Sequence, residues 1–267
     1  TDVLTEDVHF RRDWSTAHDV GRKAVAVNAA DIAAMGGQTR ALTVGLVLPA
    51  ETEVAWVEQL AAGMRVEAEA VGASIVGGDT VAGPVVVISV TALGSVEGAA
   101  LTRSGAQPGD VLAVSGRLGH AAAGLDVLRR GFKSPRALVD AHRCPQPPYG
   151  DGPAAARGGA TAMIDISDGL LADVSHLADA SGVGIAIDAG AVGVDEALTA
   201  MGRGLGVDPL AWVLTGGEDH ALAATFPAAV TPPEGFRVIG EVVDGSGVTV
   251  AGYESAGEHA GYEHFSG

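Results

Sequence analysis

The chain has 267 residues, of which 47% are hydrophobic and 18% charged, and 33 acidic against 16 basic residues give a net charge of −17. This length and composition exclude a disordered protein and suffice for one large domain or two ordinary ones. The charge excludes a basic face for nucleic acid or for an anionic membrane, so the acids either give solubility or hold divalent cations.

Neither a membrane span nor a disulfide is expected. The longest apolar stretches, 41–50 and 84–96, fall short of the roughly 20 residues that a spanning helix needs. The single cysteine, Cys144, has no partner in the chain and is interpreted as an inert structural thiol. With no secretory or transit pattern we expect a cytoplasmic protein, and the abrupt start Thr1-Asp2-Val3-Leu4 suggests a missing upstream segment.

The first half of the chain predicts the order strand, helix, strand, helix, strand, strand. Apolar residues at helical spacing before Gly36-Gly37 indicate one helix, or two short ones, over 19–35. The elements that follow are a strand at 40–48, a helix at 51–71, a strand at 73–76 that ends in Gly77-Gly78-Asp79-Thr80, and a strand at 85–93.

A polar, turn-rich segment at 103–110 separates this block from a second one, so we expect domains at 1–107 and 108–267. The second block predicts strands at 111–114, 162–166, 184–187 and 221–226, helices at 121–130 and 169–180, a proline-rich surface stretch at 144–153, and a hairpin at 237–250 with its turn at 244–247. Short strands mixed with helices in both halves favour two α/β or α+β domains over a barrel or a bundle.

Both common nucleotide-binding fingerprints are missing from the sequence. Only two lysines occur, Lys23 and Lys133, so phosphate recognition would need arginine, backbone amides or metal. Arg103 at the domain junction could clamp phosphate oxygens with two parallel hydrogen bonds, although a solvent-exposed linker arginine is an equal alternative.

Several aspartates occupy positions that suggest ligands. Asp2, Asp79 and Asp165 lie at expected strand ends, where α/β folds place their ligands. Asp31 shares the apolar face of its helix, so its carboxylate must be paired, protonated or metal-bound. With Asp168 these are five carboxylates beside hydroxyl groups, a donor set that favours magnesium or manganese over zinc.

Each of these residues also has a purely structural interpretation. Asp31 could cap a short helix, Asp79 could form an Asx turn, and Ser167 and Asp168 could begin the next helix as its N-cap and first-turn acid. The segment Thr215-Gly216-Gly217-Glu218-Asp219-His220 could form a surface turn or a wall for a cationic substrate. The following histidines show no ligand spacing and are given no role: His18, His120, His142, His176 and His259.

Seven segments, in order along the whole chain, resemble the thiamine-monophosphate kinase family, within the ATP-binding superfamily that includes aminoimidazole ribonucleotide synthetase and selenophosphate synthetase. They are Thr1-Asp2 with His9-Phe10, and the segments 28–36, 77–80, 100–105, 164–170, 216–219 and 261–265. Ala-Leu-Thr-Arg-Ser-Gly at 100–105 and the closing Gly-Tyr-Glu-His-Phe favour the thiamine enzymes over their relatives.

The resemblance implies a two-domain fold whose first domain joins a dimer sheet, and direct in-line transfer of a phosphoryl group from ATP to thiamine monophosphate with several magnesium ions. Alternatives are another ATP-using member of the superfamily or a catalytically silent nucleotide-binding scaffold. The family also has a Gly-Ile/Val-Gly-Asp-Asp segment upstream of the first strand, which this chain lacks, so at least one metal-binding acid is expected outside it.

The resemblance also implies roles for particular residues. The implied metal ligands are Thr1, Asp2, Asp31, Asp79, Asp165 and Asp168. The implied nucleotide contacts are Gly78, Asp79, Arg103 and Ser167. The implied substrate contacts are His9, Glu218 and Tyr262, with Phe265 as an alternative to Tyr262. Among these, we expect Asp31, Asp165, Asp168 and Arg103 to serve catalysis.

Overall fold

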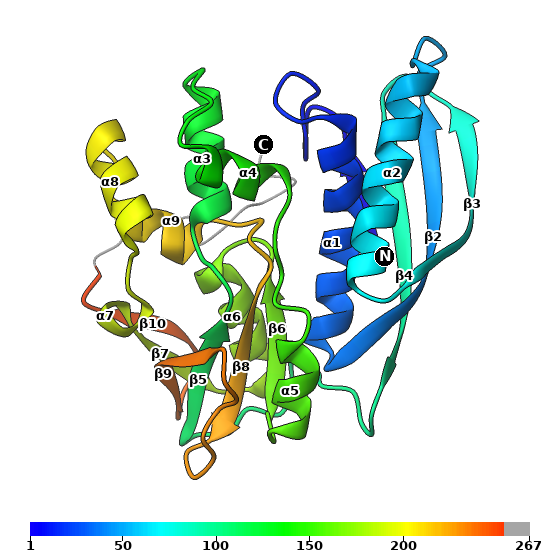
Figure 1. Ribbon diagram of the computed structural model, residues 1–267. Coiled ribbons are helices and arrows are strands. Elements are labelled where there is room, and N and C mark those ends of the chain that lie inside the picture. The colour runs from blue at the N-terminus through cyan, green and yellow to red at the C-terminus, as the bar shows by residue number, and fades with distance from the viewer. Residues whose placement is uncertain (254–267) are drawn as a thin grey trace.

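Two sheets, each with its own helices, organise the computed structural model, which describes residues 1–253 (Figure 1). The strands of the first sheet lie within residues 2–96 and those of the second within residues 110–251. The expected mixed α/β architecture of two units is confirmed, and the boundary at residue 107 stays a prediction. No helix within the described residues is long and apolar enough to cross a bilayer.

The first sheet has the strand order β1-β4-β2-β3, with β3 parallel to β2 and the other neighbours antiparallel. Its strands are β1 (Asp2–Thr5), β2 (Gly37–Leu48), β3 (Ser74–Ala82) and β4 (Val87–Val96), and its helices are α1 (Ala17–Ala34) and α2 (Val54–Ala70). Leu42, Ile88 and Leu60 belong to the core between this sheet and its helices. The expected order of elements in the first half of the chain is therefore confirmed.

Helix α1 is continuous and lies between the first sheet and the second domain (Figure 1). It begins with a capping box, in which the Thr16 hydroxyl accepts from the Asp19 N–H and the Asp19 carboxylate accepts from the Thr16 N–H. Because the helix runs on to Ala34, the interpretation of Asp31 as the cap of a second short helix is wrong.

Strand β3 is longer than expected because two glycines let it continue where a turn was predicted. The register with β2 shifts between Leu42 and Thr43, and Gly78 then approaches β2 so closely that a Cβ atom would lie 2.0 Å from the Val44 carbonyl oxygen. Gly78 also has a φ of 155°. Asp79 consequently lies inside β3, and the predictions of a strand end and of an Asx turn at this position are wrong.

The second sheet has the order β10-β7-β9-β5-β8-β6. Its strands are β5 (Asp110–Ser115), β6 (Ala162–Ile166), β7 (Gly184–Asp188), β8 (Ala221–Pro227), β9 (Phe236–Val243) and β10 (Gly247–Ala251). The helices are α3 (His120–Arg129), α4 (Arg136–Arg143), α5 (Asp151–Arg157), α6 (Leu170–Ser181), α7 (Ala189–Val192), α8 (Glu196–Leu205) and α9 (Pro209–Thr215). Val174 and Leu177 of α6 enter the main core of this domain.

The expected hairpin at 237–250 is wrong. β9 and β10 do not pair with each other, because β7 lies between them, antiparallel to β9 and parallel to β10. Gly184, the first residue of β7, pairs with both Val243 and Gly247, so the turn at 244–246 passes across the end of β7. A Cβ atom at Gly184 would lie 3.0 Å from Val243 and 3.4 Å from the backbone of Ser246, which explains why glycine occupies this crossing.

The proline-rich stretch is not a surface segment. Cys144, Pro145 and Pro147 are buried, and the stretch connects α4 to α5, two helices that the sequence analysis did not predict. The phenol of Tyr149 donates a 2.8 Å hydrogen bond to the buried carboxylate of Glu67 on α2. These residues therefore belong to the contact between the two domains.

Candidate active site

A cleft of about 1070 Å³ lies between the domains. Five of the residues predicted for the site line it, namely Asp2, His9, Ser167, Asp168 and Glu218. Trp14 from the first domain and the largely buried Trp212 of α9 also line the cleft. The cleft therefore combines acidic groups with an apolar surface, contributed by both domains.

Asp165 lies near the end of strand β6, next to His220 from the turn before β8. Both side chains are buried, and His220 Nδ1 lies 3.1 Å from Asp165 Oδ2. Burial opposes the protonation of His220, but the hydrogen bond to Asp165 and the charges of Asp165 and Glu218 together raise the pKa of the imidazole. This hydrogen bond orients the carboxylate of Asp165 at the end of β6.

Asp31 lies in the last turn of α1, where carboxylates converge. Burial, followed by the charge of Asp165 and then that of Asp2, raises the pKa of Asp31 to about 6. The side chain still has an exposed surface. Asp2 is held beside it, because its N–H donates a 3.0 Å hydrogen bond to Asn28 Oδ1 on the same helix. Asp31 on α1 is therefore near enough to Asp165 of β6 and to Asp2 of β1 to be repelled by the charge of each.

The turn between α9 and β8 has a strained backbone. Glu218 has a φ of 70° and His220 one of 51°, values that side chains other than glycine rarely adopt. Backbone hydrogen bonds from Glu218 to Ser167, 2.7 Å, and from His220 to Ile166, 2.9 Å, attach the turn to the end of β6. The turn is thus part of the site, and its interpretation as a surface turn is wrong.

Buried Asp219, between these two residues, connects the turn to α3. Its Oδ1 accepts a 3.0 Å hydrogen bond from the Ala121 N–H in the first turn of that helix. Its other oxygen, Oδ2, is buried and has no hydrogen-bond partner among the described residues. Burial raises the pKa of Asp219 to about 7, so holding this turn in place costs the protein free energy.

Glu218 is paired with a buried lysine from the other domain. The Nζ atom of Lys23, whose side chain is 1% exposed, lies 2.6 Å from Glu218 Oε2. Burial alone would raise the pKa of Glu218, but the charge and hydrogen bond of Lys23, together with the nearby His142 and His220, lower this pKa overall. His142 lies 3.9 Å from the same oxygen, and burial lowers its pKa to about 4, so it is neutral at pH 7.

Ser167 and Asp168 do not cap α6, as their structural interpretation proposed. The N-cap is Gly169, and the carboxylate of Asp173 accepts the N–H groups of Asp168 and Gly169 at 3.0 and 3.1 Å. Burial raises the pKa of Asp173 to about 7. Because Asp173 satisfies these backbone groups, the side chains of Ser167 and Asp168 can serve the cleft.

Other predicted residues lie apart from this group. Asp79 and Gly78 are on β3. Asp79 is in register with Val3 of β1 on the opposite edge of the sheet, and at the usual spacing of neighbouring strands the two backbones are about 14 Å apart. Arg103 is exposed in the segment between the domains and does not line the cleft. Thr1 is exposed, with its hydroxyl 2.9 Å from that of Thr91. Tyr262 and Phe265 lie outside the described residues.

The acids suit a hard divalent cation in kind, because all of them offer carboxylate oxygens. Their proximity also suits a cation, because the raised pKa of Asp31 is partly caused by the negative charges of neighbouring acids. Within residues 1–253, however, no three His, Cys, Asp or Glu side chains stand close enough to hold a metal ion by themselves. Magnesium usually takes only one or two carboxylates, with waters and substrate phosphates completing its shell, and this donor set is compatible with that mode.

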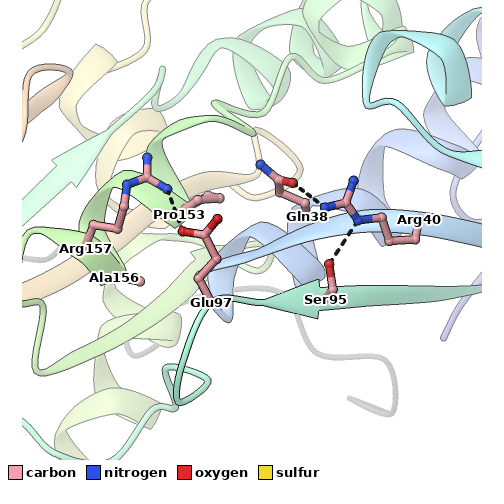
Figure 2. A pocket seen from close by; sticks show the side chains of 8 residues that line it. Gln38, Arg40, Ser95, Glu97, Pro153, Ala156 and Arg157 are labelled. Atoms are coloured by element: carbon pink, nitrogen blue, oxygen red, sulfur yellow. Dashed lines mark hydrogen bonds and ion pairs between the residues drawn. The ribbon is translucent and has the colours of Figure 1, made fainter.

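A second, smaller hollow lies at the other side of the domain contact, between β2, β4 and α5 (Figure 2). Its volume is about 30 Å³, which holds a water and little more. Its two arginines already have partners, Arg40 with Ser95 at 2.9 Å and Arg157 with Glu97 at 3.8 Å. None of the predicted site residues lines it, and we assign it no ligand.

Four functional neighbours escaped the sequence analysis: Lys23, His142, Asp173 and His220. Lys23 gave one usable signal, since a lysine between Val20 and Ala24 interrupts an apolar helix face. The others depend on contacts between segments far apart in the chain, which no local pattern reveals.

Comparison with known proteins places the whole described fold in one group. The family model "AIR synthase related protein, N-terminal domain" matches residues 1–96, and "AIR synthase related protein, C-terminal domain" matches residues 107–252. The thiamine-monophosphate kinase of Mycobacterium tuberculosis (strain CDC 1551 / Oshkosh) is 53% identical over 99% of this chain and 80% of its own length. That of Corynebacterium glutamicum is 42% identical over 91% and 75%.

Among solved structures, AaThiL complexed with AMPPCP and TMP superposes with a TM-score of 0.91 at 35% identity. The match covers 98% of this chain and 85% of that one.

Proposed function

Because this chain belongs to the thiamine-monophosphate kinase family of AIR synthase related proteins, we propose that it transfers the γ-phosphoryl group of ATP to the phosphate of thiamine monophosphate, giving thiamine diphosphate and ADP. The observation that carries the proposal is the cleft, which gathers residues of both domains and has an apolar wall beside its acids. A relative of the same fold has been captured with AMPPCP and TMP.

The reaction makes a particular demand on the protein. The attacking atom is a phosphate oxygen that is already ionised at neutral pH, so no strong general base is needed. The barrier comes instead from bringing two anionic substrates together, and in-line transfer is eased mainly by positioning and by neutralising charge. A site rich in carboxylates can meet this demand only with bound cations.

We propose that Asp2, Asp31 and Asp165 would hold Mg²⁺ together with oxygens of the ATP phosphates. The bound ions would neutralise phosphate charge and fix the two substrates in line. The chain's own contribution is to hold these carboxylates in register, through the hydrogen bond of Asp2 to Asn28 and that of His220 to Asp165. Asp168 at the cleft wall is a further candidate ligand.

The other wall of the cleft suits thiamine monophosphate. Thiamine carries a cationic thiazolium, for which an ionised Glu218 and the aromatic ring of Trp14 are favourable neighbours. His9 has a defined orientation, since its Nδ1 accepts a 3.0 Å hydrogen bond from the Thr5 N–H and its other ring nitrogen can therefore donate. Ser167 and the exposed Arg103 remain proposed contacts of ATP.

We also propose a homodimer built on the first sheet. β3 is an edge strand whose nine residues are all exposed, among them Ile75, Val76 and Val81. A hydrophobic edge of this kind is a template for pairing with another chain. If β3 of one copy meets β1 of the other, Gly78 and Asp79 approach the partner's acids, which reconciles their predicted role with their distance from Asp2 in one chain.

A cytoplasmic location completes the proposal. The single cysteine, Cys144, is a free buried thiol whose pKa burial raises to about 12. Such an inert, unpaired thiol is typical of proteins from reducing compartments.

The deciding experiment measures ADP formation by the purified protein with ATP and Mg²⁺, with and without thiamine monophosphate, and identifies thiamine diphosphate by mass spectrometry. We expect ADP and thiamine diphosphate in equal amounts. ADP release that thiamine monophosphate does not stimulate would contradict the proposal, and stimulation by an aminoimidazole precursor would favour another member of the superfamily. ATP binding without any turnover would indicate a silent scaffold.

A further inference from the structure

Lys23 connects two parts of the cleft that come from different domains. It lies on α1, and its Nζ donates to the backbone oxygen of His9 at 2.8 Å and to Oε2 of Glu218 at 2.6 Å. The first acceptor belongs to the loop between β1 and α1, and the second to the turn before β8, 195 positions away. Both residues line the cleft as proposed contacts of thiamine monophosphate.

The burial of Lys23 makes this arrangement demanding. Its side chain is 1% exposed, and an ammonium group removed from water is strongly destabilising unless anionic and polar acceptors surround it. The acceptors are one carboxylate from the second domain and one carbonyl from the first. The charge of Lys23 thus binds the loop and the turn in one geometry.

Glu218 needs such a restraint. Its backbone has a φ of 70°, and its side chain is 32% exposed at the cleft wall. A carboxylate there is free to rotate toward solvent unless one of its oxygens is held. Lys23 holds Oε2, so that the carboxylate keeps a single orientation toward the cleft, and His142 on α4 lies on the same side at 3.9 Å.

We propose that Lys23 is a positioning residue for thiamine monophosphate, which does not touch the substrate and acts through the carboxylate of Glu218. This inference rests on the proposed function, because it gives the two residues their ligand. It predicts that the loss of Lys23 weakens binding of thiamine monophosphate selectively, whereas binding of ATP, which does not depend on Glu218, is preserved.

The test is a double-mutant cycle with Lys23→Met, Glu218→Gln and the double variant, read as KM for each substrate and as the Kd for thiamine monophosphate from calorimetry. We expect each single variant to raise KM and Kd for thiamine monophosphate about tenfold, roughly 1.4 kcal/mol, with KM for ATP changed less than twofold. If Lys23 acts through Glu218, the double variant should be no more than about twofold worse than Glu218→Gln alone.

Controls separate positioning from stability. Lys133→Met makes the same chemical change at the other, exposed lysine and should leave all constants unchanged. Lys23→Arg retains the charge and should recover most of the affinity. The double variant removes both charges of the ion pair and should melt above Lys23→Met, which provides a folded protein for the cycle even where the single variant is unstable.

Two results would overturn the inference. Effects of the two single variants that multiply in the double variant would show that Lys23 acts independently of Glu218. A rise in both KM values together would show that Lys23 serves the fold alone. If the wild-type protein converts thiamine monophosphate and Lys23→Met has the same constants, only this inference is refuted. If the wild-type protein neither binds nor converts thiamine monophosphate, the proposed function is refuted as well.

Discussion

Replacing Asp31 by Asn should make the protein more stable and nearly inactive. The pKa of Asp31 rises from 3.8 to about 6 through burial and the charge of Asp165. At about 1.4 kcal/mol for each pH unit this corresponds to about 3 kcal/mol. Because the side chain is exposed, solvent screens much of the interaction, and we expect about 1 kcal/mol of it to appear in the free energy of unfolding.

The sign follows from proton linkage. A carboxyl group whose pKa is higher in the folded than in the unfolded protein destabilises the fold where both states are ionised, here above about pH 6. The penalty shrinks as the pH falls and vanishes below the unfolded value of 3.8. Asp31→Asn should therefore raise Tm by about 2–4 °C at pH 7.5, and the gain should decline toward zero at pH 4.

Differential scanning calorimetry between pH 4 and 8, without divalent cations, measures this difference. In parallel, kcat with ATP, Mg²⁺ and thiamine monophosphate should fall by about a hundredfold or more, since Asp31 is a proposed ligand of the ion that neutralises the phosphates. Asp13→Asn is a matched control: Arg11 lowers the pKa of Asp13, so its removal should give no gain in Tm and no change in kcat. A lower Tm for Asp31→Asn at pH 7.5, or wild-type turnover, would refute the reasoning.

Three further predictions concern the fold and the assembly. Gly78→Ala should cost about 2 kcal/mol or more of unfolding free energy in urea titrations, because its Cβ would meet the Val44 carbonyl, whereas Gly77→Ala, with no atom within 4 Å, should cost less than about 1 kcal/mol; equal costs would contradict the close approach. Asp173→Asn should gain stability over the wild type progressively from pH 4 to pH 7, up to about 4 kcal/mol, because burial raises the pKa of Asp173 to about 7, and a gain independent of pH would argue against a buried charge there. Val81→Glu on β3 should yield monomers in sedimentation velocity, while Val54→Glu at an exposed position of α2 should not; a wild-type monomer would exclude the dimer.

The sequence predicts the order of helices and strands well wherever the apolar residues of a segment repeat with one period, helical or strand-like. The helix at 19–35 and the strands at 111–114 and 162–166 follow from apolar spacing, and all three occur. The hairpin at 237–250 fails for another reason: a turn of four residues between two strands looks the same whether the strands pair directly or flank a third. Gly184 on β7 decides between these arrangements, and it lies more than 50 residues earlier.

In the candidate site, too, local sequence patterns identified some residues, and others depend on contacts between distant segments. Asp2, Asp31 and Asp165 could be singled out because a charge at a strand end or on an apolar helix face needs an explanation, and the structure brings them together. Asp79 could not be placed, because the strand was expected to end where Gly77 and Gly78 in fact let it continue.

The groups that hold the site residues in place could not be predicted from the sequence. His220 and Asp173 act through partners 55 and 5 positions away, and neither spacing belongs to a recognisable motif. Such partners follow only from tertiary packing.

The ion pair between Lys23 and Glu218 has a consequence for any attempt to dissect the protein. A fragment comprising only the second domain would keep the carboxylate but lose its ammonium partner, and a fragment comprising only the first would leave the ammonium with one carbonyl acceptor. Cutting the chain between its two sheets should therefore leave each piece with half of the cleft and half of the ion pair, so the two domains together are the unit to express and assay.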